Sequence, residues 1–170
     1  MKKDELSRLV KAAVFAALTC AATMMISIPI PATNGYVNTG DCVVLLGAFL
    51  LGPYYGAVAA AVGSSLADLL LSYASFAPGT FFIKGLMAVS AALIYGRLKA
   101  RTKHSALIAS LLAELWMVIG YFIYECTVLG AGIGALGGVP ANLIQAVGGT
   151  LLASLLLRTL MAVPMIRRVQ

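Results

Sequence analysis

The stretch LGPYYGAVAAAVGSSLADLLLSY, residues 51 to 73, decides the fold class of this chain. Between Pro53 and Asp68 it carries no charged side chain, and at 1.5 Å per residue it is long enough to cross a bilayer as a helix. Similar apolar stretches flank it on both sides. The whole chain of 170 residues is 61% hydrophobic and 11% charged, whereas a soluble domain carries about 25% charged residues. The composition therefore indicates an integral membrane protein.

Glycines, prolines and charges divide the chain into six predicted helices. These helices cover residues 9 to 28, 41 to 51, 54 to 73, 79 to 96, 105 to 126 and 141 to 162. The predicted fold is an all-α bundle of six transmembrane helices that forms a single domain over residues 1 to 170. The second segment is too short to span alone. Gly40, Gly52 and Pro53 at its flanks allow it to bend or to re-enter.

The positions of the basic residues predict the orientation. Eleven of the twelve lysines and arginines fall in segments that a six-helix chain places on one side: Lys2, Lys3, Arg8, Lys11, Arg97, Lys99, Arg101, Lys103, Arg158, Arg167 and Arg168. Because these residues are retained in the cytoplasm, both termini are predicted to be cytoplasmic. The basic N-terminus is similar to a signal peptide, but its apolar run is long enough to span, which favours a retained first helix.

The loops on the opposite side, residues 29 to 40, 74 to 78 and 127 to 140, hold no lysine or arginine. The first and third are rich in glycine and proline. We interpret them as lids that fold over an outward cavity, with plain flexible connectors as the alternative.

Lys84 and Asp68 are charged residues inside predicted spans, where a charge is costly unless it is paired or hydrated. They lie at similar depth near the outer ends of neighbouring helices. One interpretation is a structural ion pair between them. The other is that Lys84 points into an outward cavity and donates hydrogen bonds to a ligand, and both can hold together.

Further polar groups occur on the last two predicted helices. Glu114, Tyr121 and Glu125 are spaced by seven and four residues, which places them on one helix face. Glu125 is expected near the cavity mouth, whereas Glu114 lies near mid-membrane and can instead be protonated or bonded to a neighbouring helix. Asn142 and Gln145 share a face after Pro140, and their amides can bind a ligand or neighbouring helices.

Tyr36, Asn38 and Asp41 add an aromatic ring, an amide and a carboxylate in the first outer loop. Five segments thus bring polar side chains to the outer third of the bundle, as a small-molecule site requires. The predicted substrate-binding residues are Tyr36, Asn38, Asp41, Asp68, Lys84, Tyr121, Glu125, Asn142 and Gln145.

The first predicted helix carries two rows of small residues, Ala12 with Ala16, and Ala13 with Ala17 and Ala21. Such rows allow another helix to approach closely. That helix can belong to the same bundle or to a partner protein.

Several functions lack their motifs in this sequence. There is no phosphate-binding glycine loop, no nucleophile motif of the Gly-x-Ser-x-Gly type and no histidine pair, since His104 is the sole histidine. The net charge of +6 comes from residues between apolar segments, not from a nucleic-acid-binding patch. We therefore expect no enzyme activity, no metal, no cofactor and no nucleic-acid partner.

The segments GYVNTGD (35 to 41), LGPYYGAVAAAVGSSLADLLLSY (51 to 73), FIKGLMA (82 to 88), GYFIYE (120 to 125) and PANLIQ (140 to 145) carry a family resemblance. Together they resemble substrate-binding S components of energy-coupling factor (ECF) vitamin transporters, of the riboflavin-type, pyridoxine and hydroxymethylpyrimidine group. The resemblance implies a six-helix subunit with a short second helix that captures a vitamin from outside the cell. It also implies a multi-pass protein of a bacterial inner (plasma) membrane.

The resemblance further implies partners. A transmembrane coupling protein (the T component) would contact Ala12, Ala13, Ala16, Ala17 and Ala21, and two ATPase subunits would use the ATP. Few aromatic rings are available to sandwich a tricyclic flavin, so a one-ring B6-like or pyrimidine ligand is favoured over riboflavin. A self-sufficient proton-coupled carrier that uses Glu114 and Asp68 is the alternative from another functional class.

Overall fold

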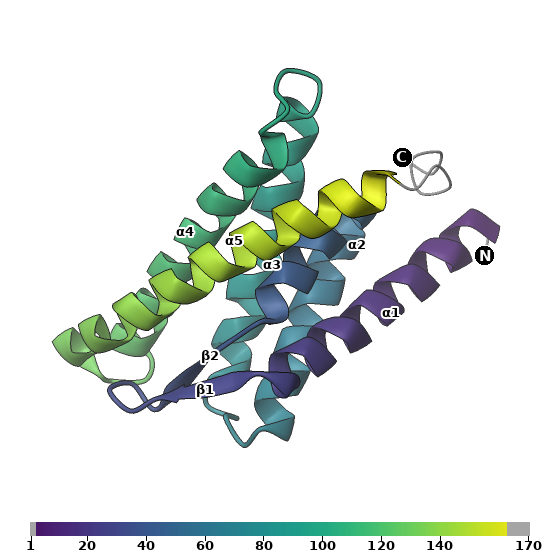
Figure 1. The fold of residues 1–170 in the computed structure, drawn as a ribbon. Coiled ribbons are helices and arrows are strands. Elements are labelled where there is room, and N and C mark those ends of the chain that lie inside the picture. The colour runs from purple at the N-terminus through teal and green to yellow at the C-terminus, as the bar shows by residue number, and fades with distance from the viewer. Residues whose placement is uncertain (1–2, 163–170) are drawn as a thin grey trace.

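The computed structural model describes residues 3 to 162, and most of this range is helical (Figure 1). The elements in chain order are α1 (Lys3–Met25), β1 (Ser27–Ile30), β2 (Gly35–Asn38), α2 (Gly40–Leu70), α3 (Ala77–Leu98), α4 (Ser105–Thr127), the 3-10 helix η1 (Gly132–Gly138) and α5 (Val139–Ala162). Within the described range, five helical segments are long and apolar enough to cross a membrane. The chain is therefore a multi-pass, helical membrane protein, as its composition predicts.

Helix α2 is broken at Gly52, between the predicted second and third segments. Gly52 has φ +80° and ψ −178°, a backbone conformation that only glycine adopts readily. Pro53 follows directly and begins the next helical run, where its missing N–H leaves no hydrogen bond unmade. The sequence Gly-Pro thus ends one limb of α2 and starts the other.

The two limbs of α2 run side by side. A straight helix would place Asp41 and Asp68 about 40 Å apart at 1.5 Å per residue. Instead, Lys84 pairs with Asp41 and lines the same cavity as Asp68. A β-carbon added to Gly56 would lie only 2.8 Å from Cα of Ala48. The chain therefore reverses direction at the break, and the first limb, residues 40 to 51, reaches only part of the way across the bundle.

The number of spans differs from the sequence prediction in one respect. Five helices meet the length and hydropathy expected of a span within residues 3 to 162, because the predicted second and third segments form one broken helix. The first limb is about 18 Å long at helical rise, too short to cross alone. The count of six spanning helices and the cytoplasmic placement of the termini stay predictions.

Strands β1 and β2 form an antiparallel hairpin in which Ile30 pairs with Gly35. The prediction of a helix as far as residue 28 was wrong at this end, since α1 ends at Met25 and the hairpin follows. Pro29 and Pro31 explain the difference, because proline removes a backbone donor and disfavours helix in the residue before it. Asn34, at φ +54°, makes the left-handed turn that asparagine tolerates better than most residues.

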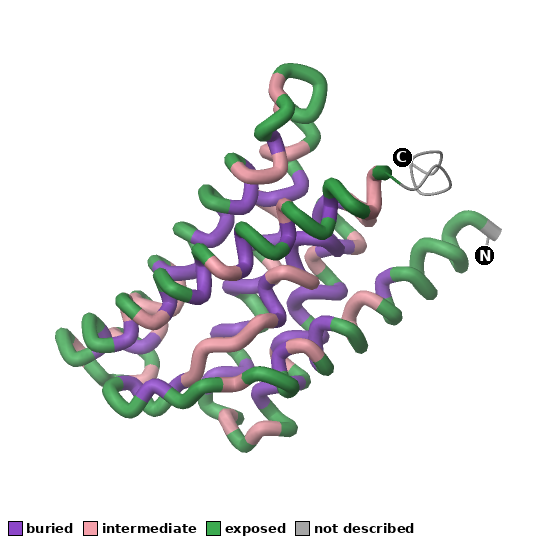
Figure 2. The backbone as a smooth tube through the Cα atoms, in the orientation of Figure 1, coloured by how far each residue is buried: buried purple, intermediate pink, exposed green. Residues whose placement is uncertain are grey.

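The interior of the bundle is built from small residues and methionine. Ala48, Ala88, Ala113, Met87 and Met117 are all fully buried. Large leucines and isoleucines are instead exposed on the outer faces of the helices, alternating along α4 and α5 with buried positions (Figure 2). Small residues inside and large apolar residues outside are the pattern of helices that pack closely within lipid.

The two ends of the bundle differ in charge. The start of α1, the end of α5 and the α3–α4 connection lie at the end away from the β1–β2 hairpin (Figure 1). At that end Arg8, Lys11 and Lys99 line one surface hollow, and Lys103 and Arg158 line another. This segregation agrees with the predicted topology. Three of the counted basic residues, Lys2, Arg167 and Arg168, lie outside the described residues.

Candidate functional site

A buried cavity lies beneath the hairpin, at the end of the bundle away from the basic residues. Its lining comes from α1, both strands and helices α2 to α5, and consists of Thr23, Ile30, Tyr36, Asn38, Ser64, Asp68, Phe76, Thr80, Lys84, Tyr121, Glu125, Asn142 and Gln145. The free volume inside the cavity is about 20 Å³, which is enough for about one water. The lining side chains therefore fill most of the cavity.

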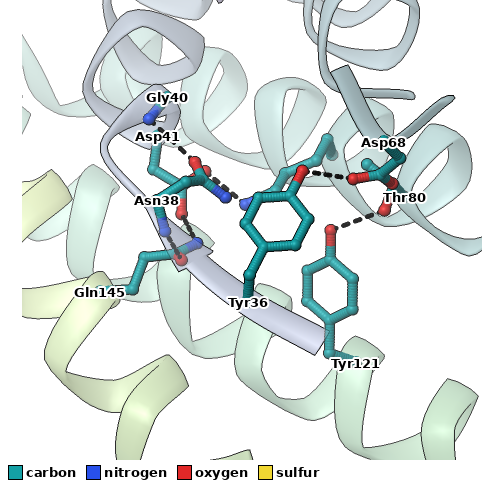
Figure 3. Close-up of polar contacts among 9 residues, drawn as sticks. Tyr36, Asn38, Gly40, Asp41, Asp68, Thr80, Tyr121 and Gln145 are labelled. Carbon is teal, nitrogen blue, oxygen red and sulfur yellow. Dashed lines mark hydrogen bonds and ion pairs between the residues drawn. The ribbon is translucent and has the colours of Figure 1, made fainter. Parts of the chain in front are cut away.

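The Asp41 carboxylate lies at the base of this cavity and contacts polar side chains from two other helices (Figure 3). It pairs with the ammonium of Lys84 and accepts a hydrogen bond of 2.6 Å from Nε2 of Gln145. Oε1 of Gln145 in turn accepts a hydrogen bond of 2.7 Å from the backbone N–H of Asn38, whose own Oδ1 accepts one from the N–H of Gly40. One carboxylate thus ties β2, α2, α3 and α5 together.

The ion pair between Lys84 and Asp68, one of the two interpretations of these residues, does not form, because Lys84 pairs with Asp41. Asp41, which was grouped with the first outer loop but also begins the predicted helix 41 to 51, lies in the first turn of α2, inside the bundle. The reversal of α2 brings both of its carboxylates, Asp41 and Asp68, to the side of Lys84. Asp41, on the short first limb, makes the ion pair. The other interpretation, that Lys84 faces a cavity, agrees with its place in the lining.

Tyr36 covers Asp68. The phenol of Tyr36 donates a hydrogen bond of 2.5 Å to Oδ1 of Asp68, and its ring lies 4.5 Å from the ring of Tyr73, centroid to centroid. Burial, followed by the nearby Asp68 carboxylate, raises the pKa of Tyr36 above its usual range. The phenol is therefore held as a hydrogen-bond donor, and it fastens the hairpin to α2.

Tyr121 forms a second wall of the cavity. Its hydroxyl is 2.9 Å from Oγ1 of Thr80, which lies beside Asp68 (Figure 3). The ammonium of Lys84 lies 5.5 Å from the centre of the Tyr121 ring, within the range of a cation–π contact. The ring and the Asp41 carboxylate together stabilise the charge of Lys84 inside the bundle.

Glu125 lies at the mouth of the cavity, under both outer loops. A β-carbon added to Gly138 would lie 3.0 Å from Oε2 of Glu125 and 2.8 Å from Cγ2 of Thr33. A β-carbon on Gly137 would lie 2.7 Å from Cβ of Ala32. Glycines are required here because the turn of the hairpin and η1 press against each other over Glu125. The two loops meet as the lid hypothesis requires, while movement of these loops stays a prediction.

The sequence prediction and the cavity agree closely in position. Eight of the nine predicted residues line the cavity, and the ninth, Asp41, contacts two of them. Asn142 and Gln145 lie one turn apart on the buried face of α5, as their spacing predicts. That any of these residues binds a ligand stays a prediction.

Sequence reasoning missed five lining residues, namely Thr23, Ile30, Ser64, Phe76 and Thr80. Ile30 and Phe76 carry no polar signal, and single hydroxyl residues are common in membrane helices. Thr80 lies four residues before Lys84, on the same helix face, and this spacing is the one signal that could have identified it.

Glu114 is buried but lies outside the cavity lining. It occupies α4 next to Gly149, where an added β-carbon would contact Oε1 of Glu114 and lie 3.0 Å from Cβ of Asp41. Neither oxygen of Glu114 has a hydrogen-bond partner within residues 3 to 162. Glu114 therefore lies close to Asp41 but does not line the cavity.

The two alanine rows of α1 face different surroundings. Ala12 is buried and Ala16 half-buried, and a β-carbon on Gly63 of α2 would lie 3.0 Å from Cα of Ala16. That row packs within the bundle. Ala13, Ala17 and Ala21 are exposed, so they remain accessible to another protein.

The fold and the cavity define a class of protein, the small helical membrane protein with a polar, buried cavity at one end of its bundle. A solved structure described as the S component of a bacterial ECF transporter shares the fold, with a TM-score of 0.67 and 22% identity over 93% of this chain and 97% of that chain. The family model described as "ECF-type riboflavin transporter, S component" matches residues 3 to 162. The chain belongs to this family, which is a family of transporter subunits and not of enzymes.

One relative is described only as an uncharacterised protein in the gap 3′ region of Pyrococcus woesei. It is 37% identical over 131 residues, which are 76% of this chain and 85% of that protein.

Proposed function

We propose that this chain is the high-affinity capture subunit of an ECF-type ABC importer and binds a small heteroaromatic vitamin from outside the cell. The observation that carries this proposal is the convergence of polar side chains from six elements on one buried cavity. Buried polar groups at the end of an apolar bundle are costly unless they serve a purpose. A ligand with a polar edge and a flat ring provides one.

A one-ring ligand, B6-like pyridoxine or hydroxymethylpyrimidine, fits the lining better than a flavin does. Three aromatic side chains, Tyr36, Phe76 and Tyr121, line the cavity. The hydroxyls of two of them are already bonded to Asp68 and Thr80, and the free space is small. A tricyclic ring would need a larger displacement of these side chains than a single ring. Riboflavin remains the second candidate because the matching family model names it.

Asn142 is the side chain best placed to form hydrogen bonds with a neutral heterocycle. It is buried, it lines the cavity, and its amide makes no hydrogen bond within the described part of the chain. An amide can donate to a ring nitrogen and accept from an amino group at once. Lys84 and Gln145 both bind the Asp41 carboxylate. Their role is therefore to fix the base of the site and to donate their remaining N–H groups to the ligand.

The chain would work with a T component and two ATPase subunits, which would supply the energy. A self-sufficient proton-coupled carrier is the competing proposal, and the open carboxyl of Glu114 is the observation that favours it. Uptake of labelled vitamin into liposomes separates the two. Uptake by the chain alone, without ATPases, would support the carrier, whereas binding without uptake supports the capture subunit.

Native mass spectrometry of the protein extracted from membranes with its bound metabolite tests the ligand directly. We expect an added mass that matches a one-ring vitamin and disappears after mild unfolding. An added mass equal to riboflavin would replace the ligand assignment. The proposed function would be contradicted if no small molecule is retained and if the ligand-free protein binds none of these vitamins when they are added.

A further inference from the structure

The charges that face the cavity do not balance. Its ionisable lining within residues 3 to 162 includes one cation, Lys84, and two carboxyl groups, those of Asp68 and Glu125. Lys84 is already neutralised by Asp41, which lies behind the lining. The two remaining carboxyl groups have no cation within the described residues to offset them. The cavity therefore presents acidic groups to whatever enters it.

Both carboxyl groups also have an open oxygen. Oδ2 of Asp68 and Oε2 of Glu125 are buried, and neither has a hydrogen-bond partner within the described part of the molecule. Each residue is only 3% exposed. A buried oxygen left without a hydrogen bond destabilises the fold, and such groups in native proteins call for an explanation. A donor brought by a ligand would satisfy both.

The two carboxyl groups approach from different helices. Asp68 belongs to the second limb of α2 and Glu125 to the last turns of α4, and α3 packs against both of these helices. Tyr36, from the hairpin, lines the space that they share and takes up the other oxygen of Asp68. A single small molecule held under the hairpin can therefore meet an acceptor on two sides.

We propose that the ligand is a nitrogen heterocycle that presents a positively charged or N–H-donating edge to Asp68 and Glu125, and that anionic vitamins are rejected. This inference rests on the proposed function and narrows its substrate class. Charge-assisted hydrogen bonds from an ammonium or amino group to these carboxylates are about twice as strong as neutral ones. A carboxylate or phosphate on the ligand would bring no donor to either open oxygen, and it would bury a further negative charge beside two acidic groups.

A matched ligand series tests the proposal on the purified, full-length protein. Pyridoxamine, pyridoxine and 4-pyridoxate share one ring and differ at one position by an ammonium, a hydroxyl and a carboxylate. Hydroxymethylpyrimidine with a 4-amino group and its 4-hydroxy analogue form a second pair, and riboflavin serves as the large neutral probe. We expect the amino member of a series to bind about tenfold or more tightly than its carboxylate or hydroxy counterpart.

Isosteric variants assign the preference to the two residues. Glu125→Gln and Asp68→Asn should each lower affinity for the amino ligand by about tenfold, while affinity for the hydroxyl ligand changes by less than about threefold. Glu114→Gln, a buried carboxyl outside the lining, is the matched control and should leave the preference unchanged. Thermal unfolding of each variant confirms that it is folded before binding is compared.

The outcomes separate this inference from the proposed function. Tight binding of the carboxylate ligand, or a charge preference that survives both variants, would overturn the inference and leave a vitamin-binding subunit. If folded protein binds none of the six compounds, the proposed function fails and this inference fails with it.

Discussion

Gln145 of α5 donates a hydrogen bond of 2.6 Å to the carboxylate of Asp41 on α2, across 104 residues of sequence. Lys84 of α3 engages the other oxygen of the same carboxylate. Three helices that approach from different sides are thus held by one acidic group, and the backbone of β2 is attached through Asn38. The floor of the cavity is fixed by these contacts, whereas its roof is the hairpin.

Removal of Asp41 should destabilise the protein strongly. In Asp41→Ala, the ammonium of Lys84 would be buried without its carboxylate, which costs about 3–5 kcal/mol for a broken buried pair. The measurement is thermal or denaturant unfolding in detergent, with Glu5→Ala at an exposed site as the control. The double variant with Lys84→Met should recover part of the loss, since two residues in contact do not contribute additively. Equal stability of Asp41→Ala and wild type would contradict this account.

Gly149 and Gly148 are neighbours with opposite expectations. A β-carbon at Gly149 would overlap Glu114 and crowd Asp41, whereas one at Gly148 would meet nothing within 4 Å. Gly149→Ala should therefore cost about 1–3 kcal/mol of stability through overpacking. Gly148→Ala should be neutral or stabilising by up to about 1 kcal/mol, because alanine favours helix over glycine. Unfolding midpoints of the two variants, compared side by side, decide the matter, and similar midpoints would argue against the close α4–α5 approach.

Alkaline pH should loosen the hairpin. Burial and the Asp68 carboxylate raise the pKa of Tyr36 in the folded state. Its contribution to stability is thus complete below the ordinary tyrosine pKa of about 10, and it is lost as pH rises from that value toward the higher folded one. In Tyr36→Phe this part of the alkaline loss should vanish. Stability measured from pH 8 to 11 checks this, and parallel curves for both proteins would show that Tyr36 is not responsible.

The exposed alanine row of α1 should affect the partner and not the fold. Ala17→Leu places a large side chain on an exposed face, so folding and vitamin binding should stay at wild-type level while copurification with a tagged T component falls. Ala12→Leu, at a buried position, should instead lower stability. Val14→Leu is the control, because Val14 is exposed and already large. Normal copurification of Ala17→Leu would remove this row from the partner surface.

The positions of the site residues could be predicted from sequence because polar side chains in apolar helices are rare and costly. Lys84, Glu125, Asn142 and Gln145 stand out for this reason, and helix periodicity places each on the inner face. Gly52 and Pro53 likewise mark the break in α2 before any coordinates are known. These predictions depend on local chemistry and on the cost of burial.

The pairing of Lys84 could not be predicted in this way. Asp41 and Asp68 are equally acidic, and only the reversal of α2 decides which of them reaches the ammonium. The hairpin was missed because two four-residue strands carry too little periodicity to separate them from a loop rich in proline and glycine. Contacts between distant segments are set by tertiary packing, which a single sequence does not display.

Calorimetric titration of the purified protein with pyridoxine, hydroxymethylpyrimidine and riboflavin, each alone, tests the central claim that this cavity binds a vitamin. Asn142→Ala should weaken binding of the preferred vitamin by about tenfold or more, since a buried amide that meets the ligand would be lost. Leu143→Ala, at the next position of α5 but exposed, should keep wild-type affinity. If Asn142→Ala binds as tightly as wild type, or if the two variants lose affinity equally, the vitamin does not bind in this cavity.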